Sequence, residues 1–424
     1  MLPRSPHLKW LFLDLNAYFA SVEQQARPEL RGRPVGVLPL QSEGTCIIAA
    51  SYEAKAFGIK TGTPVREARQ LCPDIQLVPA RHELYVKYHH LIVAEIDRHI
   101  PIAHVGSIDE VACELLGPQR ERPAAMALAR QVKRGILDRV GECLRCSIGI
   151  APNRFGAKVA SDMQKPDGLT VIEPGEMPDR LFTLELRDLA GIGANMERRL
   201  NAAGIHSVRD LAGIAPKHAR QIWGSVAGER FWYGLQGVDV PMPGEVTDRH
   251  SIGHSRILPP ALRPPEEARQ VARRLLAKAA VRLRRYGCTA RVLVISARLE
   301  SGAGWAIEAR FAPTQDSVPL LAALERGWPD LTAQHGRPRL KKVGITLLGL
   351  APLAEYMPDL FATADPAWQH RQARLSRLSG AMDTLNRRFG SDTVMLGLLP
   401  AVDLDYAGAK VAFNRIPETS EFTD

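Results

Sequence analysis

Apolar and polar positions over residues 10–170 alternate between strand-like and helix-like patterns. Apolar runs or strict alternation predict strands at 11–13, 35–38, 45–50, 111–115 and 145–150. Helical spacing predicts helices at 17–27, 51–57, 82–98 and 123–140. This order of elements is typical of a mixed α/β or α+β domain.

The pattern changes after residue 176. Residues 177–240 carry short helical patterns broken by glycines, and the Pro-Met-Pro-Gly segment at 241–244 has the composition of a linker. A second mixed unit follows, with predicted helices at 265–286 and 317–327, strands at 291–299 and 342–348, and a last helix at 368–389. With 424 residues, the chain is predicted to be an α+β protein of several domains.

Composition narrows the class of protein. No run of 18 or more apolar residues occurs, so we expect no membrane-spanning helix. The apolar run at 10–13 is too short for the core of a signal peptide. Six cysteines are too few for a disulfide scaffold, which favours a cytoplasmic protein. The 55 Lys and Arg residues outnumber the 46 Asp and Glu residues, and this balance favours an anionic partner, most often a nucleic acid.

Two acidic segments are candidates for chemistry. Asp14 directly follows an apolar strand, where in isolation Asp14 or Asn16 is best interpreted as a helix cap. Asp109 and Glu110 enter another strand, and alone they could form a solvated hairpin tip. In combination, the three carboxylates could hold two Mg²⁺ ions, because Mg²⁺ prefers carboxylate oxygens completed by phosphate. Such a pair can activate a hydroxyl and stabilise a leaving pyrophosphate.

Four segments in order resemble the motifs of Y-family (translesion) DNA polymerases, of the DinB or UmuC type. In chain order these are residues 12–23, residues 51–60, the Ser-Ile-Asp-Glu tetrapeptide at 107–110, and residues 146–153 with Lys158 and the Lys-Pro-Asp-Gly segment at 165–168. The resemblance spans roughly residues 8–400. Many members have Asp where this chain has Asn16 and Arg where it has Lys55, and a Lys grips phosphate less specifically than an Arg.

The resemblance implies roles for residues of the site. Asp14, Asp109 and Glu110 would be the catalytic carboxylates, and with the backbone carbonyl of Leu15 they would bind two Mg²⁺ ions. Five further residues correspond to positions that contact the incoming nucleotide: Tyr18, Phe19, Tyr52, Lys55 and Lys165. Of these, Phe19 would be the steric gate that excludes a 2′-hydroxyl, and Tyr18 would offer its backbone N–H.

The same resemblance implies a right-hand polymerase architecture. We expect a palm at 1–24 and 80–172, fingers at 25–79, a helical thumb at 173–240, and an α/β little finger at 246–350. A C-terminal tail would occupy 351–424. Within it, the Met-Pro-Asp-Leu-Phe segment at 357–361 is similar to peptides that dock on the sliding clamp through residues such as Leu360 and Phe361. An ordinary loop anchor explains these two residues equally well.

DNA contacts are expected in the thumb and the little finger. Gly191 and Gly193, followed by Arg198 and Arg199, resemble a helix-hairpin-helix, whose glycines let backbone N–H groups approach a phosphate. A helical turn with glycines for close packing is the alternative. The helix at 265–286 is rich in arginine, which suits DNA backbone contacts; a solvated helix face explains that pattern equally well.

The predicted function is template-directed DNA polymerisation, adding dNTPs to a primer 3′-hydroxyl by two-metal phosphoryl transfer, in error-prone translesion synthesis and DNA repair. The expected partners are primer-template DNA and dNTPs, with the sliding clamp and accessory subunits as candidates and no membrane. The expected location is the bacterial cytoplasm, at the nucleoid. The alternative is a non-catalytic relative that binds DNA and the clamp. The retention of Asp14, Asp109 and Glu110 favours the enzyme.

Overall fold

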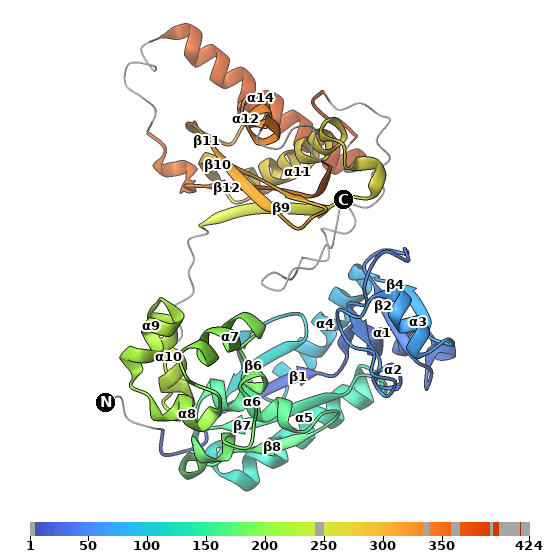
Figure 1. Cartoon of the computed structure of the whole chain (residues 1–424), viewed down its shortest axis with the longest axis vertical. Coiled ribbons are helices and arrows are strands. Elements are labelled where there is room, and N and C mark those ends of the chain that lie inside the picture. Colours follow the sequence, from blue (N-terminus) through green and yellow to red (C-terminus); the bar gives the residue numbers. More distant parts are fainter. Residues whose placement is uncertain are drawn as a thin grey trace. The chain divides into compact units, whose positions relative to one another are not determined.

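The computed structural model describes residues 5–241, 250–333, 339–357, 365–390, 393–397 and 416. The chain divides into two compact units, Met1–Met242 with Ala409–Phe422, and Pro243–Gly408 with Thr423–Asp424 (Figure 1). The two units are described separately. Among the described residues, none of the helices has the length and apolar character needed to cross a membrane.

The first unit is built on a five-stranded sheet with the order β5-β6-β1-β7-β8. Its strands are β1 (Trp10–Leu15), β5 (Ile102–Val105), β6 (Glu110–Glu114), β7 (Cys146–Ala151) and β8 (Leu169–Val171). The central strand β1 pairs antiparallel with both β6 and β7, and β7 pairs parallel with β8. Strand β1 is almost wholly buried, as expected of a central strand covered on both faces.

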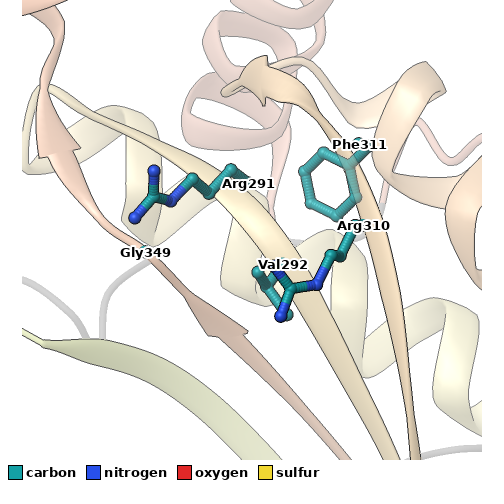
Figure 2. A pocket seen from close by; sticks show the side chains of 5 residues that line it. All are labelled: Arg291, Val292, Arg310, Phe311 and Gly349. Carbon is teal, nitrogen blue, oxygen red and sulfur yellow. The ribbon is translucent and has the colours of Figure 1, made fainter.

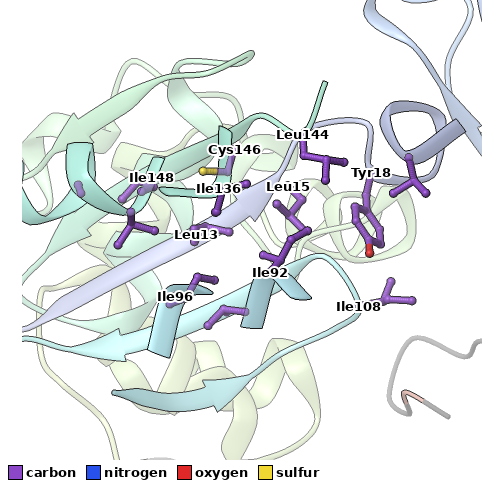
Figure 3. Close-up of a cluster of buried hydrophobic side chains, with 14 of the residues drawn as sticks. Leu13, Leu15, Tyr18, Ile92, Ile96, Ile108, Ile136, Leu144, Cys146 and Ile148 are labelled. Atoms are coloured by element: carbon purple, nitrogen blue, oxygen red, sulfur yellow. The ribbon is translucent and has the colours of Figure 1, made fainter. Parts of the chain in front are cut away.

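Side-chain alternation along β1 separates the core from the site. Leu11, Leu13 and Leu15 belong to the main core, with Ile92 and Ile96 of α4 (His82–Asp97) and residues of α5 (Arg122–Arg139) (Figure 3). Phe12 instead joins a second core with residues of α6 (Arg154–Met163). Because successive side chains point to opposite faces of a sheet, Asp14 lies on the same face as Phe12, toward α6.

Helix α6 lies directly on β7. A Cβ atom at Gly149 would come within 2.0 Å of the Ala157 carbonyl oxygen and 2.3 Å of the Ser161 nitrogen, so only glycine permits this approach. The helix starts at Asn153, whose Oδ1 accepts a 2.7 Å hydrogen bond from the Gly156 N–H, a standard N-cap. This close packing determines which parts of the sheet the polar side chains of α6 can contact.

A small lobe spans residues 18–79. It contains α1 (Tyr18–Ala26), β2 (Val35–Leu38), β3 (Ala49–Ala50), α2 (Tyr52–Lys55), α3 (Val65–Leu71) and β4 (Gln76–Pro79). Its three strands have the order β3-β2-β4 and cover a separate small core. The predicted strand at 45–50 is wrong for its first four residues, since the regular strand is confined to Ala49–Ala50 and Cys46 makes only an isolated bridge with Pro64.

Four helices follow the sheet of the first unit: α7 (Ala194–Ala202), α8 (Val208–Gly213), α9 (Pro216–Trp223) and α10 (Val226–Leu235). They share the second core with α6, through residues such as Leu200 and Leu211. Short 3-10 turns lie at Pro28–Leu30, Gly117–Arg120, Pro174–Glu176, Asp179–Leu181, Leu186–Asp188, Pro260–Leu262 and Leu353–Glu355. The four-part division predicted for palm, fingers, thumb and little finger stays a prediction.

The second unit has an antiparallel sheet of order β11-β10-β12-β9. Its strands are β9 (Ser251–Ile257), β10 (Cys288–Leu299), β11 (Gly304–Thr314) and β12 (Leu340–Leu348), with β13 (Ala351–Pro352) paired to β10. Helices α11 (Pro265–Arg285) and α12 (Ser317–Ala333) pack on one face of the sheet, and α14 (Pro366–Phe389) packs against α12 (Figure 1). Strands β9 and β11 were not predicted, although Trp305, Ile307, Ala309 and Phe311 alternate with exposed positions along β11.

Candidate active site

The sheet brings the acidic segments together. In the antiparallel register of β1 and β6, Asp14 is directly opposite Glu110. The Leu15 N–H donates a 2.9 Å hydrogen bond to the Asp109 carbonyl, which fixes the loop before β6 against the end of β1. Asp14 is only 6% exposed. The residues predicted to be carboxylate ligands from segments about a hundred positions apart therefore meet at one end of the sheet.

Two lysines hold the Asp14 carboxylate. Lys158 Nζ on α6 lies 2.6 Å from Asp14 Oδ2 and 2.9 Å from Glu110 Oε1. Lys165 Nζ lies 2.6 Å from Asp14 Oδ1, and both lysines also contact Asp162. Burial alone would lower the pKa of Lys158, but the surrounding carboxylates outweigh burial and raise it above its ordinary value. Both lysines therefore stay charged.

Asp109 lies beside this cluster. Its Oδ1 accepts a 2.5 Å hydrogen bond from Ser107 Oγ. Burial raises the pKa of Asp109, and the negative charges of Asp14 and Glu110 add to that rise, partly opposed by the Ser107 hydrogen bond. The site thus concentrates negative charge at a place that water does not screen well.

The donor set suits a divalent cation. Within the part of the chain that the structure describes, no group of three His, Cys, Asp or Glu side chains is already arranged around a metal position. Carboxylate oxygens of Asp14 and Glu110 do converge on one positively charged atom, Lys158 Nζ. Carboxylates that converge on a cation are the ligands that Mg²⁺ prefers, so the residues present fit such an ion.

A polar network positions the loop that carries Lys165. Asn16 Nδ2 donates to Ser147 Oγ at 3.1 Å, and Asn16 Oδ1 accepts from the Asp167 N–H at 2.7 Å. Lys133 Nζ donates to the carbonyls of Asp167 and Gly168. An ionised Asp at position 16 could accept but could not donate. Asn16 therefore donates one hydrogen bond and accepts another, and so connects the end of β1 to β7 and to the loop.

Tyr52 and Lys55 face the same region from α2. Lys55 Nζ lies 4.1 Å above the Tyr52 ring centre, a cation–π contact. Burial lowers the pKa of Lys55, and the positive charge of Lys165 lowers it further. Burial also raises the pKa of the Tyr52 hydroxyl. The charge of Lys165 acts on the pKa values of both Tyr52 and Lys55, so the three side chains lie near one another; their contact with a triphosphate stays a prediction.

Tyr18 and Phe19 are anchored on Tyr85 of α4. The Tyr18 hydroxyl donates a 2.6 Å hydrogen bond to the Tyr85 carbonyl, so its side chain is committed to the core. The Phe19 ring stacks on the Tyr85 ring with centres 4.3 Å apart and planes 13° apart. This stacking fixes the position of the Phe19 ring; its role as a steric gate stays a prediction.

Comparison with known proteins decides the family. The model of the impB/mucB/samB family matches residues 13–162, and the model of that family's C-terminal domain matches residues 249–360. The DNA polymerase IV of Moorella thermoacetica is 36% identical over 394 residues, which cover 91% of this chain and 94% of the relative. The chain belongs to the impB/mucB/samB family, the Y-family of DNA polymerases.

Further relatives agree. The DNA polymerase IV of Pelotomaculum thermopropionicum is 33% identical over 406 residues, which cover 94% of this Y-family chain and 96% of the relative. Among solved structures, a Y-family DNA polymerase chimera of Dbh and Dpo4 superposes with a TM-score of 0.69 at 25% identity, over 81% of this chain and 99% of that one. An insertion ternary complex of Dbh DNA polymerase gives a TM-score of 0.54 at 25% identity, with the same coverage of both chains. The prediction of the family and of an α+β polymerase fold is confirmed.

The segment of this Y-family polymerase that was predicted to be a helix-hairpin-helix contains the 3-10 turn Leu186–Asp188, the turn at Gly191 and Gly193, and α7. Gly191 has φ of +100°, which favours glycine, and a side chain at Gly193 would meet open space. Arg198 is exposed and bonds only to Asn195 of its own helix among described contacts. Arg199 instead donates to the Ile222 carbonyl and ties α7 to α9. A phosphate contact by these residues stays a prediction.

The arginines of α11 are largely engaged within the second unit. Arg269 Nη1 lies 3.2 Å from Glu325 Oε2, and Arg273 also pairs with Glu325. Arg284 donates two 2.6 Å hydrogen bonds to Asp383. These three residues hold α11 to α12 and α14, so the arginine-rich pattern of this helix has a structural explanation. The predicted clamp peptide residues Leu360 and Phe361 lie outside the described residues.

The face of the β11-β10-β12-β9 sheet away from the helices is more open to a ligand. Ser255, Gly344, Ser296 and Ala306 are in register across its four strands, so the middle of the face carries small side chains. A hollow of about 420 Å³ is lined by Arg291, Val292, Arg310, Phe311 and Gly349 (Figure 2). Two arginines from neighbouring strands border this hollow, which suits a phosphate backbone.

Lys158 and Asp162 are the site residues whose role was not predicted. Lys158 was noted within the family motif but was given no function. Its signal in the sequence is the four-residue spacing of Lys158 and Asp162, which places the two side chains one turn apart on the same face of α6. The contact of Lys158 with Glu110, however, depends on the packing of α6 against the sheet.

Proposed function

We propose that this Y-family polymerase extends a primer 3′-hydroxyl with deoxynucleotides selected by a template strand, including damaged templates. The observation that carries the proposal is the meeting of Asp14 and Glu110, from two strands, beside the cationic and phenolic groups of Lys165, Lys55 and Tyr52. One side of this pocket suits cations and the other suits phosphates. That pairing is what nucleotidyl transfer requires.

Different residues of this chain would bind the metal ions, the triphosphate and the deoxyribose. Asp14, Asp109 and Glu110, with the Leu15 carbonyl, would hold two Mg²⁺ ions, which when bound would activate the primer hydroxyl and stabilise the leaving pyrophosphate. Lys165, Lys55 and Tyr52 bind and orient the triphosphate of the dNTP. Phe19, fixed on Tyr85, contacts the deoxyribose where a 2′-hydroxyl would clash. Tyr18 offers its backbone N–H to the triphosphate.

Primer-template DNA is the proposed macromolecular partner. The neighbour described as an insertion ternary complex of Dbh DNA polymerase supports this assignment. On this chain, Gly191, Gly193 and Arg198 of the first unit, with Arg199 as a structural tie, and the open sheet face of the second unit would bind the DNA backbone. The sliding clamp is a candidate partner through Leu360 and Phe361, and accessory subunits are a further class of candidate partner. We place the protein at the bacterial nucleoid.

Primer extension by the full purified chain tests the proposal. The assay contains Mg²⁺, dNTPs, and an undamaged template or a template with one abasic site. We expect extension by the wild type and none by Asp109→Ala/Glu110→Ala, with the same primer-template affinity by fluorescence polarisation. Binding without extension by the wild type would instead support the non-catalytic adaptor.

A second assay tests the nucleotide pocket. Phe19→Ala should raise insertion of ribonucleotides relative to deoxynucleotides by at least about tenfold, because the steric barrier is removed. Tyr18→Phe is the matched control: it removes a hydroxyl that is bound to the core and leaves the backbone unchanged, so sugar selection should not change. An equal effect of both substitutions would contradict the assignment of Phe19.

A further inference from the structure

Helix α14 lies beyond the residues that the model of the family's C-terminal domain matches. The C-terminal family match ends at residue 360, whereas α14 spans Pro366–Phe389. Its arginines are Arg371, Arg374, Arg377, Arg387 and Arg388, and its only acidic residue is Asp383. Surface helices usually intersperse acids with bases, so the charge of α14 is unusually one-sided.

The single acidic residue of α14, Asp383, forms an ion pair within the second unit. Arg284 grips Asp383 in a bidentate pair with 2.6 Å contacts, and these side chains are only 12% and 15% exposed. On the same side of the helix, Ser379 Oγ accepts a hydrogen bond from the Ser317 N–H. These contacts fix one face of α14 toward α12. They also leave no carboxylate of α14 to neutralise its arginines.

The opposite side of α14 carries a basic stripe, defined here as His370, Arg374, Arg377 and Arg388. At 3.6 residues per turn, spacings of four, three and eleven residues place these side chains on one line along the helix. All four are exposed. Within the described ranges, none of the three arginines pairs with a carboxylate; Arg377 bonds only to the Ala373 carbonyl of its own helix, and Arg388 lies over the Phe389 ring.

The residues between these cations are small. Ala381 and Thr384 fill the gap in the line between Arg377 and Arg388, so no bulky side chain stands between the stripe and a partner. From Arg374 to Arg388 the stripe extends about 21 Å at 1.5 Å per residue. A DNA duplex presents about twelve phosphate charges over that length. The stripe therefore matches a repeating polyanion in both length and charge.

We infer that the basic stripe of α14 binds the phosphate backbone of DNA. The stripe lies on the helical side of the second unit, because α12 stands between α14 and the sheet (Figure 1). DNA on the open sheet face and DNA on α14 would therefore be different segments. The second segment would be either a single-stranded stretch of template or another duplex. This inference concerns affinity for DNA and does not depend on the polymerase activity proposed above.

The test compares salt dependence of DNA binding by the full chain. The variant Arg374→Ala/Arg377→Ala keeps good helix formers, and the matched control Arg130→Ala/Arg134→Ala removes two exposed arginines from α5. Fluorescein-labelled 30-nucleotide single-stranded and 30-base-pair probes are titrated between 50 and 200 mM NaCl. If both arginines contact phosphates, the slope of log K against log salt should fall by about 1.8 for duplex or about 1.4 for a single strand.

Each outcome is decisive. A fall with one probe identifies which form of DNA the stripe binds, and the control should keep the wild-type slope. A slope unchanged for both probes, or an equal fall in the control, overturns the inference. The rate of single-nucleotide insertion at saturating DNA is measured in parallel and should be unchanged. A wild type that cannot insert nucleotides but shows the slope difference would refute the proposed function alone.

Discussion

The acidic end of the first unit's sheet and helix α11 both join basic side chains to carboxylates, but their charge balances differ. In the first region, Asp14, Glu110 and Asp162 share only Lys158 and Lys165, and Asp109 lies beside them. In the second, Arg269 pairs with Glu266 and Glu325, Arg273 pairs with Glu325, and Arg284 pairs with Asp383. The first region therefore has more carboxylates than cations, whereas in the second three arginines are matched by three carboxylates.

This difference separates a site from a structural contact. Unbalanced carboxylates in a largely buried pocket are unstable without a further cation, so the cluster around Asp14 is ready to accept one. The paired arginines of α11 have found their partners and hold helices together. An arginine-rich sequence pattern therefore does not identify a DNA surface until the carboxylates that face it are known. The following substitutions test this comparison, from the largest expected effect to the smallest.

Asp14→Asn should have the largest effect. It removes one negative charge from the centre of the carboxylate cluster and leaves Lys158 and Lys165 with fewer carboxylate partners. We expect single-nucleotide insertion to fall by at least about a thousandfold, equivalent to several kcal/mol of transition-state stabilisation. Circular dichroism should show an intact fold. A loss of insertion below about tenfold would contradict the central role of Asp14.

Arg284→Ala should loosen α14 without affecting chemistry. Removing one partner of a largely buried ion pair costs roughly 3 kcal/mol, because Asp383 keeps its burial but loses its counter-charge. Hydrogen exchange in peptides covering 366–389 should accelerate by about a hundredfold. Arg326→Ala, on an exposed position of α12, is the control and should leave exchange unchanged. A change in insertion rate at saturating DNA would argue against a purely structural pair.

Lys158→Met should tighten binding of divalent metal in the absence of DNA and nucleotide. A unit charge about 4 Å away contributes up to about 4 kcal/mol near a protein surface, and screening by neighbouring groups reduces this to a gain of about tenfold in affinity. Electron paramagnetic resonance of Mn²⁺ gives the affinity directly. Lys158→Arg keeps the charge and is the control. Weaker Mn²⁺ binding by the Met variant would show that Lys158 supports the metal site instead of competing with it.

Glu325→Gln should have the smallest effect. The Glu325 side chain is 33% exposed, so solvent screens its pairs with Arg269 and Arg273. We expect the free energy of unfolding to fall by about 1 kcal/mol, measured as a shift of the urea midpoint. Glu308→Gln is the control, since its contact with Arg310 is 3.8 Å long and both side chains are highly exposed. A larger loss than that of Arg284→Ala would reverse the ranking of the two pairs.

The sequence was sufficient for the parts of the site that follow from strand pattern and motif. Asp14 at the end of an apolar strand, and Asp109 with Glu110 at the start of another, are local features, and the sheet register then brings Asp14 and Glu110 together. Phe19 and Lys165 were predicted only through the family resemblance. Their anchors, the Tyr85 ring and the Asn16 network, are contacts between distant segments.

Other features depend on tertiary packing and could not be predicted. Arg269 and Glu325 are 56 positions apart, so a pattern confined to α11 cannot reveal their pairing. Strand β9 alternates exposed and covered positions, but polar His254 and Arg256 occupy two of the covered positions and Ile257 is exposed, so its sequence lacks apolar alternation. Strand β11 does alternate, and a stricter count of period-two positions would have found it.

Gly149 shows that the packing of α6 on β7 leaves no room for a larger side chain. The helix that carries Lys158 and Asp162 packs directly against the Cα of Gly149. Any other amino acid at this position would place its Cβ atom 2.0 Å from a main-chain oxygen. Accommodating even a methyl group means moving α6 away from β7, and Lys158 would move with it. In a library covering every codon of the gene, position 149 should therefore behave like a catalytic residue. Variants there would accumulate as soluble, inactive protein, although the side chain at that position never touches a substrate.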